Sequence, residues 1–187
     1  MRAFVAIFPP PEIQAAAVAM ALEAVRRHGV RAGDRMRWVR PENVHLTLKF
    51  LGDVQEEVLG DLCAALETCA GHAPFDVSLA GLGAFPSAQR ARILWTGVGA
   101  GFDRLRALAM DLEAALAPLG FEREKRSYTP HLTLGRVRSR PASFDALPTV
   151  TEDLRFRVRR VELAESMLTP EGAVYRIIGA FALKRRS

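Results

Sequence analysis

The chain has 187 residues, of which 49% are hydrophobic and 25% are charged. This size and apolar content allow one domain, or two small, closely joined lobes, with a substantial core, and they exclude a low-complexity chain. The net charge is +5, and 23 of the 26 basic residues are arginine. Arginine binds phosphate with a two-pronged donor fork, so this excess favours a polyanionic partner, although a codon bias toward Arg and Ala gives the same composition.

The sequence carries no sign of secretion or of a membrane anchor. The apolar run in residues 1–8 is too short for a signal peptide, and no other run is long enough to span a bilayer. Cys63 and Cys69 lie about 9 Å apart along a predicted helix and on different faces, which is too far for a disulfide. Free thiols suit a reducing compartment, so we expect a cytoplasmic protein, and a monomer without an obligate partner.

The first half of the chain alternates predicted strands with predicted helices. Residues 2–8 are apolar and rich in β-formers, which indicates a central strand with both faces covered. Residues 11–30 carry apolar side chains at helical spacing. The other predicted elements of this half are a short strand at 36–39, a strand from 44 that stops at 52–53, and a helix at 54–70.

The second half is richer in strands. Its predicted strands are 75–85, 92–98, one that follows Pro130, about 154–165 and 174–183, and its predicted helix is 102–116. Strands that pair locally as well as across helices indicate an α+β fold with mainly antiparallel pairing, rather than a doubly wound parallel sheet.

The sequence His-Leu-Thr-Leu occurs twice, at 45–48 and 131–134, and uses two of the four histidines in the chain. Each copy alternates polar with apolar residues, as a half-buried strand does. The histidine and threonine of each copy therefore share one face, while the leucines anchor the strand in a core. The two pairs are His45 with Thr47 and His131 with Thr133.

The repetition of this motif in comparable surroundings indicates an internal pseudo-repeat. We expect residues 1–187 to form a single bilobed domain, a pseudo-twofold arrangement of two mainly antiparallel sheets with helices on the outer faces and a central cleft. Such an arrangement brings two imidazoles and two hydroxyls to one small ligand.

Paired histidines with hydroxyl partners suit acid–base catalysis on a phosphodiester. The unperturbed pKa of imidazole is about 6.5, so a neutral and a protonated ring can coexist near neutral pH. The neutral ring accepts a proton from the attacking water or hydroxyl, and the charged ring protonates the departing oxygen. Thr47 and Thr133 can donate hydrogen bonds to the non-bridging oxygens. This scheme requires no metal and no cofactor.

Other interpretations of the histidines are structural or metal-binding. Either one alone is equally well explained as a core or surface residue beside a β-forming threonine, whereas the doubled, strand-phased pair favours catalysis. Catalytic zinc needs three protein ligands, and no Cys or carboxylate lies at ligand spacing from either motif histidine. His28 and His72 are interpreted as solvated cap or loop residues.

Further candidates flank the motifs. Arg136 is the candidate phosphate-binding cation, but strict alternation puts it on the wrong face unless the strand ends or bulges near Gly135. It is equally explained as a solvated arginine. In an unbroken strand Lys49 faces the same way as His45 and Thr47, and it is therefore expected at the cleft rim. Trp38 and Tyr128 are candidates to stack on a base, and Phe50 is expected on the leucine face.

These residues resemble the two-histidine phosphoesterase superfamily, and within it the RNA 2′,3′-cyclic phosphodiesterases once called 2′-5′ RNA ligases. The Pro-Glu-Asn-x-His-Leu-Thr-Leu and Pro-His-Leu-Thr-Leu-x-Arg contexts are specific to this branch. The resemblance runs through residues 2–7, 38–52, 83–86, 92–95 and 130–136 and a closing segment around Gly172 and Tyr175.

The resemblance implies a bilobed α+β fold and metal-free hydrolysis of a 2′,3′-cyclic phosphate at an RNA end to a 2′-phosphomonoester. It also implies that His45 is the proton donor and His131 the proton acceptor. The reverse reaction, ATP-independent 2′-5′ ligation, follows from microscopic reversibility. Two alternatives fit the same residues: a cyclic phosphodiesterase acting on a small nucleotide, and a non-catalytic RNA-binding module.

Overall fold

The computed structural model describes residues 1–27, 36–69, 71–138, 140–144, 147, 154–170 and 172–184. Its strands are β1 (Arg2–Ile7), β2 (Met36–Trp38), β3 (Leu46–Asp53), β4 (Phe75–Phe85), β5 (Ile93–Val98), β6 (His131–Val137), β7 (Arg155–Val158), β8 (Arg160–Thr169) and β9 (Gly172–Ala182). Its helices are α1 (Pro11–Arg27), α2 (Leu59–Cys69) and α3 (Phe102–Leu116), with a short 3-10 turn, η2 (Pro41–Asn43), before the first motif.

Most predicted elements are present, with two differences. The predicted strand at about 154–165 is two strands, β7 and β8, because the chain passes at this point from one half of the sheet to the other. The predicted helix at 54–70 begins only at Leu59; Val54 is buried without being helical. The predicted end of the first helix beyond Arg27, together with His28 and Ala70, lies outside the described residues.

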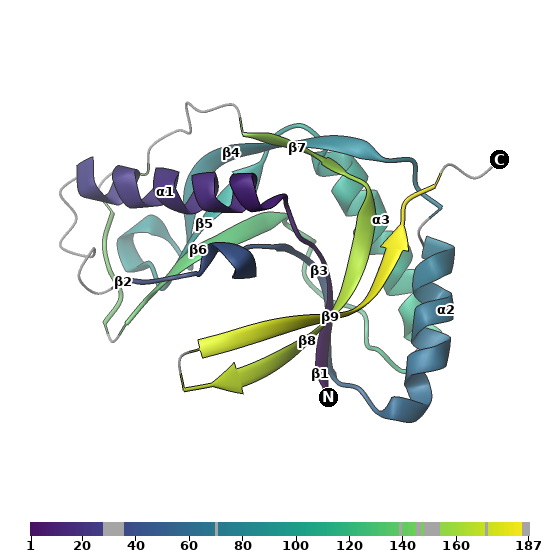
Figure 1. Cartoon of the computed structure of the whole chain (residues 1–187). Coiled ribbons are helices and arrows are strands. Elements are labelled where there is room, and N and C mark those ends of the chain that lie inside the picture. The colour runs from purple at the N-terminus through teal and green to yellow at the C-terminus, as the bar shows by residue number, and fades with distance from the viewer. Residues whose placement is uncertain are drawn as a thin grey trace.

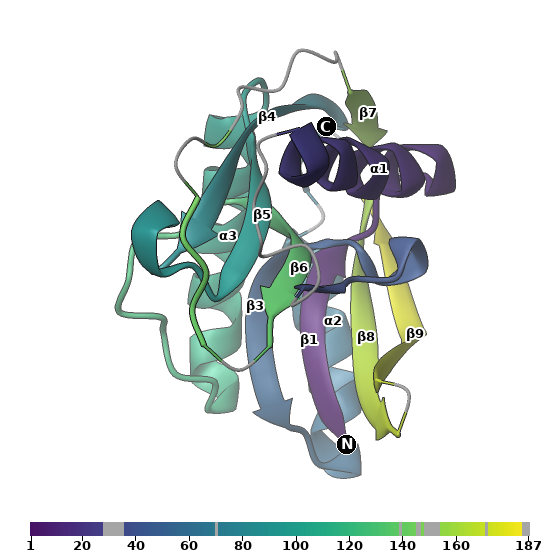
Figure 2. The same cartoon turned by 90° about the vertical axis from the view of Figure 1, so that its left-hand side faces the viewer.

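All strand pairings in the described part of the chain are antiparallel, in the order β7-β4-β5-β6-β3-β1-β8-β9, with β2 added to β6. The order is symmetric about its centre: β1-α1-β3 and β5-α3-β6 are equivalent units whose second strands carry the motifs. Figure 2 shows β3, β1, β8 and β9 side by side as one half of the sheet, with β6, β5 and β4 in the other. The α+β expectation with antiparallel halves is confirmed.

The helices lie over the outside of the curled sheet, and α1 and α3 each cross to the motif strand of the other half. α1 contacts β6, and α3 contacts β3 and α2. Figure 1 shows α1 along one half and α2 and α3 beside the other. The motif leucines point to this side and are buried in the main core. Among the described helices, none combines the length and apolar character needed to cross a bilayer, and Cys63 is a free thiol.

Strand β1 is covered on both faces, as predicted. Ala3, Val5 and Ile7 belong to the main core, whereas Phe4 and Ala6 belong to a small apolar cluster on the opposite face. Because the side chains of a β-strand alternate between its two faces, β1 contributes residues to an apolar cluster on each side. The second cluster supports the face that carries the motif histidines.

A register shift interrupts the alternation of both motif strands. In β3 the partners of Val5 and Ala6 are Lys49 and Thr47, so Leu48 is an extra residue. A β-bulge of this kind reverses the faces of the side chains that follow it, here up to a second shift at Leu51. Phe50 therefore lies on the histidine face and is 75% exposed, whereas Lys49 is buried. The expectations that Phe50 lies on the leucine face and that Lys49 shares the face of His45 and Thr47 were both wrong, because they assumed unbroken alternation.

The same shift occurs in β6. The partners of Leu94 and Trp95 are Gly135 and Thr133, so Leu134 is the extra residue. Arg136 is consequently exposed while Gly135 is buried. The bulge lies at the same position of each motif, and Phe50 and Arg136 are therefore equivalent positions of the two halves.

Lys49 connects three segments beneath the sheet. Its Nζ donates hydrogen bonds of 2.7 Å to Glu113 Oε2 of α3 and of 2.7 Å to the carbonyl of Glu122 in the loop that follows. The lysine side chain is 5% exposed and that of Glu113 is 20% exposed. A buried charge needs such a partner, so this pair anchors the loop at 122–129 to β3.

We expect Lys49→Met to lower the free energy of unfolding by about 1–3 kcal/mol, because it leaves the Glu113 carboxylate without its cation. Urea denaturation measures the change. The matched control is Lys125→Met, which removes an exposed lysine and should change the stability by less than about 0.5 kcal/mol. Equal stability of the two variants would contradict a structural role for Lys49.

Candidate active site

The two halves of the sheet join at one pair of motif residues. Leu46 of β3 is the partner of Leu132 of β6, and both side chains are fully buried. In an antiparallel register the residues on either side of this pair are also level with one another. His45 is therefore level with Thr133, and Thr47 with His131. The two imidazoles occupy one diagonal of the site and the two hydroxyls the other.

Both imidazoles are oriented by the backbone in the same way. His45 Nδ1 lies 2.7 Å from the carbonyl oxygen of Asn43, and His131 Nδ1 lies 2.8 Å from that of Thr129. A carbonyl oxygen only accepts hydrogen bonds, so Nδ1 carries the proton in each ring. Nε2 is then the atom that accepts or donates a proton. The turn before His45 is itself held, because Asn43 Nδ2 donates a 2.8 Å hydrogen bond to Ala173 O.

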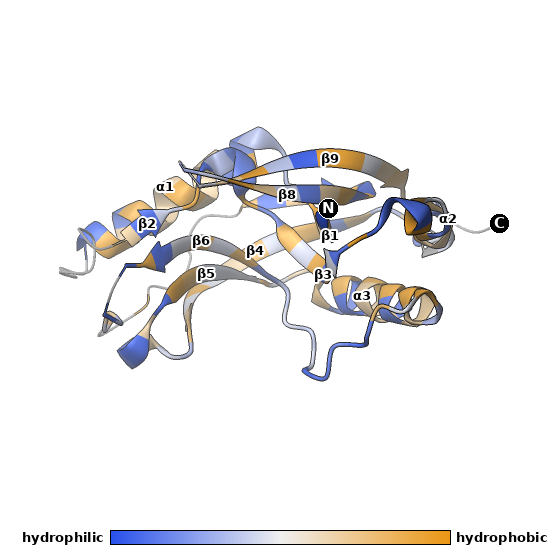
Figure 3. Cartoon of the chain, turned by 90° about the horizontal axis from the view of Figure 1, so that it is seen from below, coloured by the Kyte–Doolittle hydropathy of each residue, from blue (hydrophilic) through white to orange (hydrophobic). Residues whose placement is uncertain are grey.

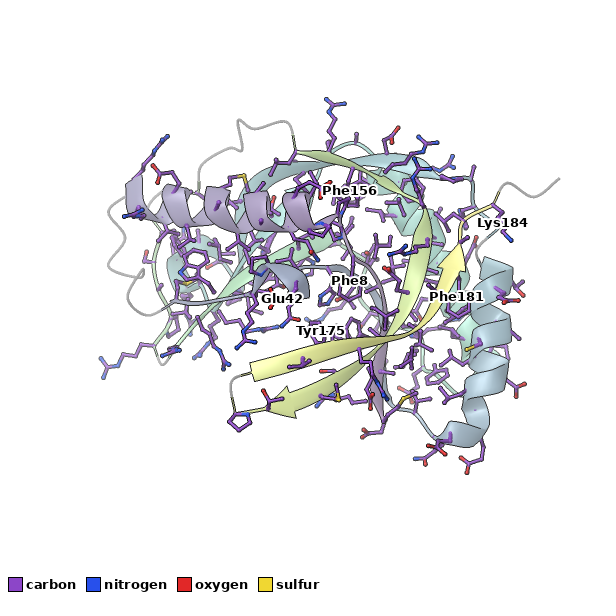
Figure 4. All side chains as sticks on the ribbon, in the orientation of Figure 1. Phe8, Glu42, Phe156, Tyr175, Phe181 and Lys184 are labelled. Atoms are coloured by element: carbon purple, nitrogen blue, oxygen red, sulfur yellow. The ribbon has the colours of Figure 1, made fainter. Side chains whose placement is uncertain are left out.

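His45 is enclosed by aromatic rings. The ring centroids of Phe4, Phe8 and Tyr175 lie 4.9, 5.2 and 5.1 Å from that of His45. Figure 4 shows Phe8 and Tyr175 near one another at the centre of the molecule, beside the β8–β9 hairpin. Sequence reasoning did not select Phe4 and Phe8, since an apolar run at residues 2–8 marks only a covered strand.

The surroundings lower the pKa of His45 to about 4. Burial is the main cause, and the positive charges of His131 and Arg136 add to it, while the hydrogen bond to the Asn43 carbonyl acts in the opposite direction. In the free protein the His45 ring is therefore neutral at pH 7, with Nε2 available to accept a proton.

Aromatic rings also surround His131, but they come from other residues than those around His45. Phe85 and Trp95 stack with their centroids 5.0 Å apart, and both contact the His131 ring edge-on, at 5.2 and 5.9 Å. The indole lies directly over Gly83, where a Cβ atom would collide with it. The glycine thus permits the close approach that places Trp95 beside the site. His131 also lines an open cavity together with Thr47.

The bulge in β6 turns the Arg136 side chain to the face of the sheet that carries the motif histidines. Its positive charge lowers the pKa of both His45 and Tyr175, which requires proximity to both rings. Burial is the larger influence on Tyr175 and raises the pKa of its phenol. Arg136 and Tyr175 thus lie beside the His45 ring, with Tyr175 on β9 of the β8–β9 hairpin.

The two predicted stacking residues differ in their relation to the site: Tyr128 lines the same cavity as His131 and Thr47, whereas Trp38 is not in that lining. Trp38 is opposite Gly135 in the β2–β6 pair, and both it and Tyr128 pack against the main core. The Tyr128 hydroxyl is buried without a hydrogen-bond partner among the described residues, and burial raises its pKa. The large exposed aromatic on the motif face is Phe50.

The remaining histidine of the described chain is remote from the motifs. His72 Nε2 lies 2.8 Å from Asp111 Oδ2 at the protein surface. Within the described residues, no group of three His, Cys, Asp or Glu side chains is placed to hold a metal ion.

Known proteins are similar to this chain in sequence and in fold. An RNA 2',3'-cyclic phosphodiesterase of Aeropyrum pernix is 35% identical over 162 residues, covering 84% of this chain and 92% of that protein. The crystal structure of TT0787 of Thermus thermophilus is similar over 100% of both chains, with a TM-score of 0.83 and 31% identity. E. coli LigT complexed with 3'-AMP is similar over 98% of both chains, with a TM-score of 0.75 and 27% identity.

The sequence also matches a family model over most of its length. The match covers residues 9–167 and includes both motifs. With the symmetric sheet and the paired histidines, this match shows that the chain belongs to the 2'-5' RNA ligase superfamily.

Proposed function

We propose that this protein hydrolyses the 2′,3′-cyclic phosphate at an RNA end to a 2′-phosphomonoester. The observation that carries the proposal is the convergence of the two imidazole–hydroxyl pairs at the Leu46–Leu132 junction. The relatives named RNA 2',3'-cyclic phosphodiesterase support the choice of substrate.

In the proposed reaction, one imidazole accepts a proton from water through Nε2 as the water oxygen bonds to phosphorus. The bond between phosphorus and the 3′ oxygen breaks, and the other imidazole protonates that oxygen. Thr47 and Thr133 donate hydrogen bonds to the non-bridging oxygens, and the Arg136 guanidinium neutralises their charge. The same sequence with a 5′-hydroxyl in place of water joins the cyclic end to that hydroxyl through a 2′-5′ linkage, without ATP.

The surroundings of His45 bear on which histidine donates the proton and which accepts it. A residue that accepts a proton must be neutral beforehand, and the lowered pKa keeps His45 neutral. A neutral His45 suits the acceptor role, whereas the family resemblance implies that His45 is the donor and His131 the acceptor.

We expect His45→Ala and His131→Ala each to lower the rate on a cyclic-phosphate-ended oligonucleotide by about 10² or more, because each removes an acid or a base. The assay contains a chelator, and the product ends are identified. Full activity in both variants, or RNA binding without turnover in the parent protein, would contradict the proposal.

The two assignments of roles are distinguished by a substrate with a better leaving group. In a nucleoside 4-nitrophenyl phosphodiester, nitrophenolate departs without a proton, so loss of the general acid matters little. We expect His131→Ala to recover most of its activity on this substrate and His45→Ala to recover none. The opposite result would make His45 the donor.

The pH dependence tests the environment of His45. Because burial disfavours the charged ring, we expect its NMR titration midpoint, and the acidic limb of kcat/KM, near pH 4 rather than near the unperturbed value of about 6.5. Phe8→Ala admits water and should raise both midpoints. Phe85→Ala, which removes a ring beside His131 only, is the control. A parent midpoint near 6.5 would contradict the burial argument.

A further inference from the structure

Tyr175 is the polar member of the group of aromatic rings around His45. The other two rings, Phe4 and Phe8, offer only carbon surface, whereas Tyr175 adds a hydroxyl. The tyrosine ring stands perpendicular to the imidazole, at an interplanar angle of 90° and with the centroids 5.1 Å apart. A phenylalanine at this position would enclose His45 equally well, so enclosure does not account for the hydroxyl.

The side chain of Tyr175 lies on the active face of the sheet. Tyr175 is the cross-strand partner of Ser166 in β8, two residues beyond Ala164, which belongs to the small apolar cluster with Phe4. The alternation of β8 puts Ser166, and with it Tyr175, on the face that carries the motif histidines. Figure 3 shows the β8–β9 hairpin facing β5 and β6 of the other half of the sheet.

The fold itself does not use the Tyr175 hydroxyl. The residue is half-buried and lines a cavity of about 620 Å³ together with Phe8. Within the described part of the chain this hydroxyl has no hydrogen-bond partner. Burial raises the pKa of the phenol, so the hydroxyl keeps its proton at neutral pH. A hydrogen-bond donor is therefore available beside His45.

Arg136 acts on this phenol and on the imidazole at the same time. Its positive charge lowers the pKa of His45, and it lowers that of Tyr175 against the larger effect of burial. Arg136 comes from β6 and Tyr175 from β9, so the two side chains approach His45 from different halves of the sheet. In the proposed reaction the guanidinium neutralises the non-bridging oxygens, and the phenol lies beside the same oxygens.

The strand that carries this hydroxyl is fastened next to the site. At Gly172, whose φ is +133°, a Cβ atom would collide with the guanidinium of Arg37 from β2. Asn43 Nδ2 donates a 2.8 Å hydrogen bond to Ala173 O, and the carbonyl of the same asparagine accepts the Nδ1 proton of His45. One residue thus holds both the imidazole and β9. A donor fixed in advance is what stabilises charge that develops in a transition state.

We propose that Tyr175 is a further catalytic residue, whose hydroxyl donates a hydrogen bond to one non-bridging oxygen of the phosphate beside Arg136. The phenol keeps its proton throughout, so the proton transfers remain those of the two imidazoles. Negative charge on this oxygen grows as water bonds to phosphorus, so the hydrogen bond is stronger in the transition state than in the bound substrate. The inference rests on the proposed function and adds a third hydroxyl to those of Thr47 and Thr133.

The first test is Tyr175→Phe, which keeps the ring against Phe4 and His45 and removes only the hydroxyl. We expect kcat on a cyclic-phosphate-ended oligonucleotide to fall about tenfold or more, and KM to change by less than about twofold, because the lost bond matters in the transition state. The matched control is Tyr128→Phe. The hydroxyl that it removes is buried within the protein, so kcat should remain that of the parent.

Phosphorothioate substrates separate a direct contact from a structural effect. The two diastereomers of a 2′,3′-cyclic phosphorothioate carry sulfur at one or the other non-bridging position, and sulfur is a weak hydrogen-bond acceptor. With sulfur at the position that Tyr175 contacts, Tyr175→Phe should lower the rate by less than about twofold, since the bond is already weakened. With sulfur at the other position the loss should be about tenfold, as for the oxygen substrate.

Full activity of Tyr175→Phe, or equal losses on all three substrates, would overturn the inference, while hydrolysis by the parent protein still supports the proposed function. Equal losses are the result expected if the substitution only displaces the His45 ring. If the parent protein does not hydrolyse the oxygen substrate, the proposed function fails and the inference fails with it.

Discussion

The packing of Leu46 against Leu132 at the junction of β3 and β6 is the constraint on which the site depends. The halves of the sheet are joined there by one residue pair, and both leucines are fully buried. Because neighbouring residues of a strand face opposite ways, the contact that hides the leucines also turns the imidazoles and hydroxyls to the other side. The core and the active face are therefore two consequences of one register, and a shift of one residue would destroy both.

The two halves share a backbone plan but differ in what surrounds their histidines. Each imidazole is held through Nδ1 by a carbonyl two residues earlier, and each motif strand has a bulge at its second leucine. The bulges bring Phe50 to the active face in one half and Arg136 in the other. His45 is enclosed by aromatic rings, whereas His131 opens to a cavity. The symmetry of the fold places the two imidazoles alike, and the departures from symmetry give them different neighbours, which for His45 lower the pKa of the ring.

Several features were readable from residues alone because they depend on local spacing. The apolar period of α3 predicted its bounds, and the alternation of His-Leu-Thr-Leu predicted which side chains share a face. The same rule failed for Lys49 and Phe50, because a bulge arises from pairing with β1, which lies far away in the chain. Trp38 and Tyr128 were chosen for nearness in sequence. Tyr128 lines the cavity beside His131, whereas Trp38 lies on β2 opposite Gly135, and nearness in sequence does not distinguish these two positions.

The sequence by itself determined the repeated motif, the antiparallel α+β class and the chemistry that two imidazoles can perform, since these follow from residue type and period. Only the tertiary structure decided that the motifs meet, that Phe8 and Tyr175 enclose His45, and that the cations of the loop at 122–129 line a cavity leading from His131. These relations join segments distant in the chain, and long-range strand pairing and burial, rather than local propensity, establish them.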